Sequence, residues 1–202
     1  MLYKLLGKLP SDTIEFFLTE INKRKDLDKE YQWVPFDDFL NQKFMEIFEN
    51  SELEIQYDPY KKIWIQKAFY SKPGHGWKIH KDGIQCKTAM NIALSCNDGD
   101  WVRWYDEDYI NSLTNITTNT DIQGLGNSRN IDINDYETIP FIHEIKTSPG
   151  DVYLVNTDVF HSFKCSGPKD RIIIQTKFKG YPPIDIVDNS LSNKSFTNLI
   201  KN

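Results

Sequence analysis

Cysteine, histidine and arginine are scarce in this chain, and it contains no long basic or apolar run. The 202 residues include three cysteines without a C-x-x-C spacing, so neither a disulfide framework nor a zinc knuckle is indicated. The longest basic run is Lys23-Arg24-Lys25 and the net charge is −5, which argues against nucleic acid or an anionic membrane surface as the main partner. No stretch approaches the roughly 18 uninterrupted apolar residues that span a membrane. These absences favour a small-molecule or protein substrate.

The N-terminal segment and the composition are typical of an intracellular globular protein. Residues 1–8 have too short an apolar core for a secretory signal. Cys86, Cys96 and Cys165 are expected to be small buried residues in a reducing compartment. A chain of 202 residues can bury one substantial core and is short for two. We therefore expect a soluble, cytoplasmic protein with a single domain over 1–202, and its oligomeric state stays open.

Two amphipathic helices are predicted within residues 1–50, which we interpret as helical support for a core. Capping residues open the first, and the apolar residues behind them recur at helical spacing, so a helix is expected over 11–24. Asp37-Asp38 precedes a second apolar stripe over 39–48. Apolar residues at this spacing usually face a core, so both helices are expected to be packing elements.

From about residue 52 the hydrophobic period changes from helical to alternating. About nine short strands are predicted over 52–178, separated by turn pairs such as Asp98-Gly99 and Pro149-Gly150. Two helices followed by nine strands favour a mainly β fold, a double-sheet sandwich or jelly roll with helices against one face. Residues 106–141 are rich in Asn, Thr, Asp and Gly, so we interpret them as a long insertion that covers the mouth of a site. The polar tail, 181–202, is expected to be loosely attached.

The most informative feature is the H-x-D sequence of His80 and Asp82, followed at a distance by His161. An i, i+2 spacing places both side chains of the H-x-D on the same face of an extended strand, where they can chelate one ion. Two imidazoles and one carboxylate on one face of a ferrous ion leave three positions open, enough for a bidentate 2-oxo acid and O2. The tripeptide alone carries little weight, because four histidines and 29 acidic residues in 202 positions give about 0.6 chance matches.

The position of Arg171 supports the interpretation of this motif as a functional site. The chain has four arginines, and this one begins an apolar run ten positions after His161. The residue ten positions after His143 is Tyr153, which offers no cation, so His161 is preferred as the third ligand. A planar guanidinium can form two parallel hydrogen bonds to a carboxylate and stays charged at any working pH. The structural alternative for Arg171 is a salt bridge at a sheet edge.

This arrangement resembles the Fe(II)- and 2-oxoglutarate-dependent oxygenases over roughly residues 62–178. The resemblance implies a distorted double-stranded β-helix in which His80, Asp82 and His161 are the catalytic iron ligands. It implies that Arg171 binds the distal carboxylate of 2-oxoglutarate, and that O2 is the second co-substrate. Hydroxylation of an aliphatic C–H, with succinate and CO2 as products, is then the default outcome. Halogenating relatives replace the carboxylate ligand with a small residue, and Asp82 retains it here.

The chain departs from the family pattern at Ile173. Family members often carry a hydroxyl residue two positions after the arginine, so the second donor of the carboxylate clamp stays open among Tyr153, Thr176 and Tyr70. Asn91 lies on the small, partly polar face of its predicted strand. Its amide would bind co-substrate or substrate, or serve a structural role.

Several alternatives stay open at this stage. His75, between two glycines, is either a substrate contact or a simple loop residue. The segment Trp101–Trp104 forms either a pocket wall or core packing. The substrate could be an amino acid, a protein residue or another small metabolite. The rival functions are another metal-dependent cupin enzyme that does not use 2-oxoglutarate, and a non-catalytic β-sandwich binding module.

Overall fold

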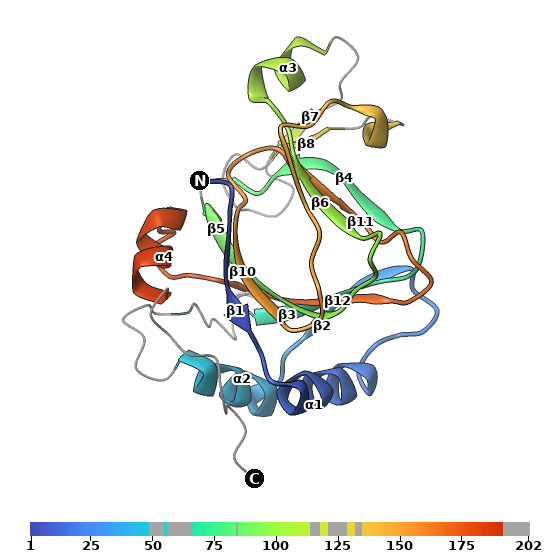
Figure 1. Cartoon of the computed structure of the whole chain (residues 1–202), viewed down its shortest axis with the longest axis vertical. Helices are drawn as coiled ribbons and strands as arrows, with labels where there is room; N and C mark the ends of the chain where they lie inside the picture. The colour runs from blue at the N-terminus through green and yellow to red at the C-terminus, as the bar shows by residue number, and fades with distance from the viewer. Residues whose placement is uncertain are drawn as a thin grey trace.

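Two antiparallel six-stranded sheets face each other in the structure (Figure 1). The computed structural model describes residues 1–48, 55, 66–83, 85–113, 118–120, 129–131 and 135–191. The first sheet has the strand order β1-β10-β5-β12-β3-β2, and the second has the order β7-β8-β4-β11-β6-β9. From β3 to β6, successive strands alternate between the two sheets. This winding is that of a double-stranded β-helix, and it confirms the mainly β fold predicted from the sequence.

The strands are short, and the longest ones lie at the centre of the first sheet. The first sheet consists of β1 (Tyr3–Lys8), β2 (Tyr31–Pro35), β3 (Gln66–Ser71), β5 (Thr88–Ser95), β10 (Asp151–Asn156) and β12 (Arg171–Lys177). The second sheet consists of β4 (Gly76–Lys81), β6 (Trp101–Trp104), β7 (Thr118–Thr120), β8 (Arg129–Ile131), β9 (His143–Ile145) and β11 (His161–Lys164).

β12 shows how the alternating pattern produces a strand with two different faces. Ile172 and Ile174 belong to the apolar cluster that the first sheet shares with the helices. Arg171, Ile173 and Lys177 line the cavity between the sheets. Successive side chains of a strand point to opposite faces, so one run of seven residues can both bury apolar surface and present cations to the interior. Burial of the outer face stabilises the sheet, and the inner face is left for binding.

The helices α1 (Ser11–Asn22) and α2 (Asp38–Met45) cover the outer face of the first sheet (Figure 1). Phe17 of α1 is fully buried there. The Asp37 carboxylate accepts a hydrogen bond from the Leu40 N–H at 2.8 Å and caps α2, as the sequence predicted. The remaining helical elements are η1 (Glu46–Phe48), α3 (Glu107–Ser112), η2 (Tyr136–Thr138) and α4 (Ile184–Leu191).

Two parts of the chain differ from the prediction. Residues 1–50 are not only helical, because β1 and β2 extend the first sheet at its two edges. The prediction of a loosely attached tail was wrong for its first part, since α4 buries Ile184, Val187 and Leu191 in the apolar cluster. Their i, i+3 and i+7 spacing makes an amphipathic helix, which the polar residues around them concealed.

The three cysteines are placed as the sequence predicted. Cys86, Cys96 and Cys165 are buried and free of disulfides, as expected.

Within the part of the chain that the structure describes, no helix is long and apolar enough to cross a bilayer. The strands predicted over 53–57 and 63–65 lie outside the described residues, apart from Ile55, which forms an isolated bridge with Phe178.

Candidate active site

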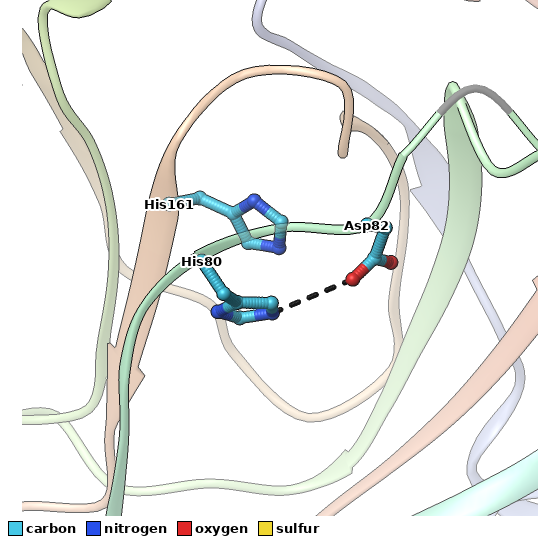
Figure 2. Close-up of side chains that lie close together, drawn as sticks. All are labelled: His80, Asp82 and His161. Carbon is cyan, nitrogen blue, oxygen red and sulfur yellow. Dashed lines mark ion pairs between the residues drawn. The ribbon is translucent and has the colours of Figure 1, made fainter. Parts of the chain in front are cut away.

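The pairing of β4 with β11 brings His80 and His161 together. His161 lies opposite His80 in the antiparallel register, and the two ring centroids are 4.1 Å apart. Asp82 follows β4, and its backbone N–H donates to the Thr157 carbonyl at 2.9 Å. Figure 2 shows the three side chains close together, with His80 Nε2 3.5 Å from Asp82 Oδ1. One ligand atom from each residue lies within 4.8 Å of the other two, so the three predicted metal ligands share one site.

Backbone hydrogen bonds fix the orientation of both imidazole rings. His80 Nδ1 lies 2.9 Å from the Lys78 carbonyl oxygen, and His161 Nδ1 lies 2.8 Å from the Val159 carbonyl oxygen. Because a carbonyl oxygen only accepts, each Nδ1 carries the proton and each Nε2 keeps its lone pair. Metal-binding histidines are usually held in this way through the other ring nitrogen. The rings are therefore prepared to bind a cation through Nε2.

The charge state of the three side chains also suits a metal. Burial, followed by the neighbouring His161, lowers the pKa of His80 to about 4. Burial likewise lowers the pKa of His161. Burial alone would raise the pKa of Asp82, but Lys177 and the two histidines lower it to about 2. At neutral pH the site thus holds two neutral imidazoles and one carboxylate, a donor set that fits Fe(II).

The second oxygen of the Asp82 carboxylate contacts two other side chains. Asp82 Oδ2 lies 3.7 Å from Lys177 Nζ, and the Cys86 thiol donates to it at 3.4 Å. Burial raises the pKa of the Cys86 thiol to about 11, so the thiol stays protonated. Burial alone would lower the pKa of Lys177, but the charge of the Asp82 carboxylate outweighs it and the pKa is raised above its usual value. An ammonium group from the first sheet and a thiol from the connection between β4 and β5 therefore hold this carboxylate.

Arg171 lies at the other end of β12 from Lys177, about 20 Å away along the strand. It is buried, with 4% of its surface exposed, and its guanidinium carbon lies 4.6 Å from the centre of the Phe163 ring. Among the described residues, its Nε has no hydrogen-bond partner, and neither has Asn91 Oδ1 or the Tyr153 hydroxyl. Asn91 and Tyr153 are register neighbours on β5 and β10. A buried guanidinium N–H without a partner is costly, so Arg171 fits a ligand that carries a carboxylate. Asn91 Oδ1 is an acceptor and would need a donor instead.

A single cavity contains both groups of residues. His80, Asp82, His161, Asn91 and Arg171 all line it. Its walls also include an aromatic group made of Tyr31, Trp33, Phe69, Trp77 and Phe163, together with the polar residues Lys67, Lys81, Asn130, Thr157, Gln175 and Lys177. Lys67 Nζ lies 3.7 Å from the centre of the Trp33 ring. The metal donors and the buried guanidinium thus face one space, as the spacing of the motif suggested.

Not all residues weighed at the sequence level reach this cavity. Tyr153 is fully buried and does not line it. Tyr70 belongs to the apolar cluster on the helix side of the first sheet, and Thr176 is on the same face of β12 as Ile174, so neither is a candidate second donor. His75 stacks on Tyr31 with ring centroids 5.1 Å apart and does not line the cavity either.

The segment Trp101–Trp104 mostly serves packing. Trp104 is fully buried, and its indole N–H donates to the Asn156 carbonyl at 2.9 Å. Arg103 pairs with Glu144 at 2.7 Å and lies against the Trp101 ring. Val102 is the member of this segment that lines the cavity. The core-packing interpretation of the two tryptophans therefore holds.

The described part of segment 106–141 is attached to the strand that carries His80. β8 pairs with β4 so that Asn130 lies opposite His80, and Asn130 lines the cavity. Lys81 pairs with Glu107 of α3 at 3.0 Å. The segment therefore contributes to the metal end of the cavity. Its role as a cover over the mouth stays a prediction.

Sequence reasoning missed Lys177 and the aromatic wall from β2. The alternation on β12 contained the signal for Lys177, because residues 171, 173, 175 and 177 share one face of a strand. For Tyr31 and Trp33 no comparable signal exists. Their place in the cavity depends on pairing between β2 and β3, which are far apart in the sequence.

Comparisons with known proteins support the fold. No family model matches the chain, and no curated protein matches it. HygX from Streptomyces hygroscopicus, solved with nickel and 2-oxoglutarate bound, is similar with a TM-score of 0.52 and 11% identity, covering 90% of this chain and 83% of HygX. HygX with nickel, 2-oxoglutarate and hygromycin B bound gives 0.51 and 12% over the same shares. A Pseudomonas putida prolyl-4-hydroxylase gives 0.46 and 13%, covering 87% and 91%.

The strand winding and the likeness to HygX agree with each other. The eight strands β3 to β6 and β9 to β12 form the two interleaved halves of the barrel, and the predicted metal ligands lie on the second sheet and directly after it. The chain thus has the double-stranded β-helix fold predicted from the sequence, and over that fold it is similar to HygX, a protein solved with nickel and 2-oxoglutarate bound.

Proposed function

We propose that this chain is an Fe(II)- and 2-oxoglutarate-dependent oxygenase that hydroxylates an aliphatic C–H of an amino acid, a protein residue or another small metabolite. One observation carries the proposal: the donor set of His80, Asp82 and His161 shares a cavity with the buried guanidinium of Arg171. A metal site alone would fit many cupin enzymes. A second, buried cation at a distance from the metal donors is what a dicarboxylate co-substrate requires.

The residues of the cavity have separate roles in binding the metal and in binding and orienting the co-substrate. When bound, Fe(II) and 2-oxoglutarate supply the oxidation of a C–H bond by O2, with succinate and CO2 as products. His80 and His161 present neutral Nε2 donors, and Asp82 adds one negative charge to the metal site. Arg171 binds the distal carboxylate through two parallel hydrogen bonds and so orients the 2-oxo acid end toward the metal ligands.

Asn91 is proposed as a further co-substrate contact, and Tyr153 as a residue that supports it. Asn91 lines the cavity, so its amide can reach a ligand directly. Tyr153 pairs with Asn91 in the register of β10 and β5 but does not line the cavity. We assign it the smaller role of supporting this end of the cavity from behind. Ile173 occupies the position where a hydroxyl is frequent in the family, so the clamp relies on other donors.

The test is the turnover of 2-oxoglutarate by the purified protein with added Fe(II) and ascorbate. Succinate formation above that of an Asp82→Ala variant is the expected result, because the variant lacks the carboxylate of the metal site. A screen of amino acids, peptides and small metabolites then follows the stimulation of succinate formation. Metal binding without any 2-oxoglutarate-dependent product would favour another metal-dependent cupin enzyme. Absence of metal binding would favour a non-catalytic binding module.

A further inference from the structure

The Asp82 carboxylate has two oxygens with different surroundings. Oδ1 faces His80 Nε2 at 3.5 Å, on the side where the metal ligands converge. Oδ2 faces away from them, 3.7 Å from Lys177 Nζ and 3.4 Å from the Cys86 thiol. A carboxylate that binds a metal through both oxygens must turn both toward it. Here the second oxygen is already held by two groups.

Both of these groups have fixed positions of their own. Lys177 is the last residue of β12, is buried, and lies opposite Ala89 of β5. Cys86 is buried, and its Sγ lies 3.4 Å from Thr157 Oγ1. The Asp82 backbone is held as well, because its N–H donates to the Thr157 carbonyl. The carboxylate can therefore rotate little without losing one of these contacts.

We propose that Lys177, assisted by Cys86, is a positioning residue that keeps Asp82 a monodentate metal ligand through Oδ1. This inference rests on the proposed function and deepens it. A ferrous ion with three protein donor atoms has three positions left, which a bidentate 2-oxo acid and O2 fill together. A bidentate Asp82 would occupy one of these positions. Lys177 thus preserves the open coordination that the co-substrate needs, without touching the co-substrate.

The experiment compares Lys177→Met with Lys177→Arg in the Co(II)-loaded protein. Methionine keeps an unbranched side chain one atom shorter and removes its charge, whereas arginine keeps the charge. The visible absorption of Co(II) reports its coordination without any turnover. We expect the Lys177→Met spectrum to differ from that of the wild type with metal alone, and the Kd of the Co(II) protein for 2-oxoglutarate to rise about tenfold or more. Lys177→Arg should restore the wild-type spectrum and bring the Kd to within a few-fold of the wild-type value.

Two further variants keep the test decisive. Lys179→Met removes an exposed lysine two residues later and should change neither the spectrum nor the Kd. If Lys177→Met does not fold, as judged by circular dichroism and thermal unfolding, Cys86→Ala removes the other contact to the same oxygen. It should change the Co(II) spectrum in the same direction by a smaller amount.

The possible outcomes separate this inference from the proposed function. Spectra and Kd values equal to those of the wild type in folded Lys177→Met would overturn the positioning role, while the oxygenase proposal would stand. A wild-type protein that binds Co(II) but not 2-oxoglutarate would overturn the oxygenase proposal. In that case the metal-only spectra of Lys177→Met and Lys177→Arg would still decide how Asp82 is held.

Discussion

The two ends of the cavity differ in how their polar groups are satisfied. At the metal end, the Nδ1 atoms of His80 and His161 donate to backbone carbonyls, and the second oxygen of Asp82 contacts an ammonium and a thiol. At the inner end, the donor Arg171 Nε has no partner among the described residues. One end is organised before a ligand arrives, and the other is completed by the ligand.

Under the proposed function, this difference corresponds to separate requirements for binding the metal and for binding the co-substrate. A metal ion gains little from the surrounding protein unless its ligands are oriented in advance, and the hydrogen-bonded rings provide that orientation. A flexible dicarboxylate brings its own acceptors, so the protein needs only donors at a fixed distance. Substitutions at the two ends should therefore affect different binding constants, which the following predictions test.

The largest effect is expected from His161→Ala. Removal of one of three protein ligands should lower the affinity for Fe(II) or Co(II) by at least about 100-fold and abolish turnover. The fold should persist, because His161 lies in the cavity rather than in the apolar clusters. Calorimetric metal titration and circular dichroism measure the two quantities. The matched control is His143→Ala, an exposed histidine on β9, and comparable metal loss there would contradict the assignment.

Arg171→Ala should weaken the binding of 2-oxoglutarate at the inner end of the cavity and leave the affinity for the metal nearly unchanged. Loss of a buried carboxylate partner costs on the order of 2–5 kcal/mol, a rise of roughly thirty- to several-thousand-fold in the Kd for 2-oxoglutarate. Affinity for Fe(II) should stay within a few-fold of the wild type. The conservative variant Arg171→Lys should give an intermediate Kd, because an ammonium lacks the planar fork of the guanidinium. Unchanged 2-oxoglutarate binding in Arg171→Ala would remove the main support for the oxygenase proposal.

In the absence of bound metal, acid should lower the free energy of unfolding of the protein through His80. The pKa of His80 is about 4 in the folded state and 6.5 without the fold, so protonation is disfavoured in the folded state. This contribution to stability is fully present above about pH 6.5 and is lost as the pH falls toward 4. Between pH 7.5 and 4.5 we expect a loss of about 2–3 kcal/mol in the free energy of unfolding from this residue.

Urea unfolding of wild type and His80→Gln at the two pH values tests this expectation. Glutamine does not titrate, so the variant should lose less stability between pH 7.5 and 4.5. Equal pH dependence in the two proteins would show that His80 is not the group responsible. Added Co(II) should steepen the dependence of the wild type, because the metal binds only neutral imidazole.

The smallest effect is expected from Tyr153→Phe, which tests whether the hydroxyl behind the inner end contributes to stability or to the binding of 2-oxoglutarate. The Tyr153 hydroxyl is buried without a hydrogen-bond partner among the described residues, so its removal should leave the free energy of unfolding unchanged or raise it by about 1 kcal/mol. Affinity for 2-oxoglutarate should fall by only a few-fold. A large loss of stability in urea unfolding would mean that the hydroxyl has a structural role instead.

The local parts of this site could be predicted, and the non-local parts could not. His80 and Asp82 follow from the two-residue period of a strand, which is visible in three letters of sequence. Arg171 followed from its spacing to His161. In contrast, the contact of Lys177 with Asp82 requires β12 of the first sheet to face the end of β4 in the second sheet across the cavity, and no local pattern encodes that distance.

The same reasoning explains the errors in the fold. α4 was missed because its three buried residues are embedded in a polar segment, and only their burial against the first sheet makes them a helix face. β1 and β2 are edge strands that depend on partners far away in the sequence, β10 and β3. Helix stripes and alternating strands are local patterns, whereas the addition of an edge strand depends on tertiary structure.

β12 is the last strand of the described chain, yet it lies in the middle of the first sheet, between β5 and β3. A growing chain that ends at residue 164 already contains His80, Asp82 and His161, but its first sheet is in two pieces. Only the arrival of β12 joins them, and closure over so long a separation is slow. The same strand delivers Arg171 and Lys177. Synthesis therefore completes the first sheet in the same step that delivers these two buried cations. Under the proposed function, a chain that still lacks β12 would have all three predicted metal ligands but neither the residue proposed to bind the 2-oxo acid nor the one proposed to position Asp82.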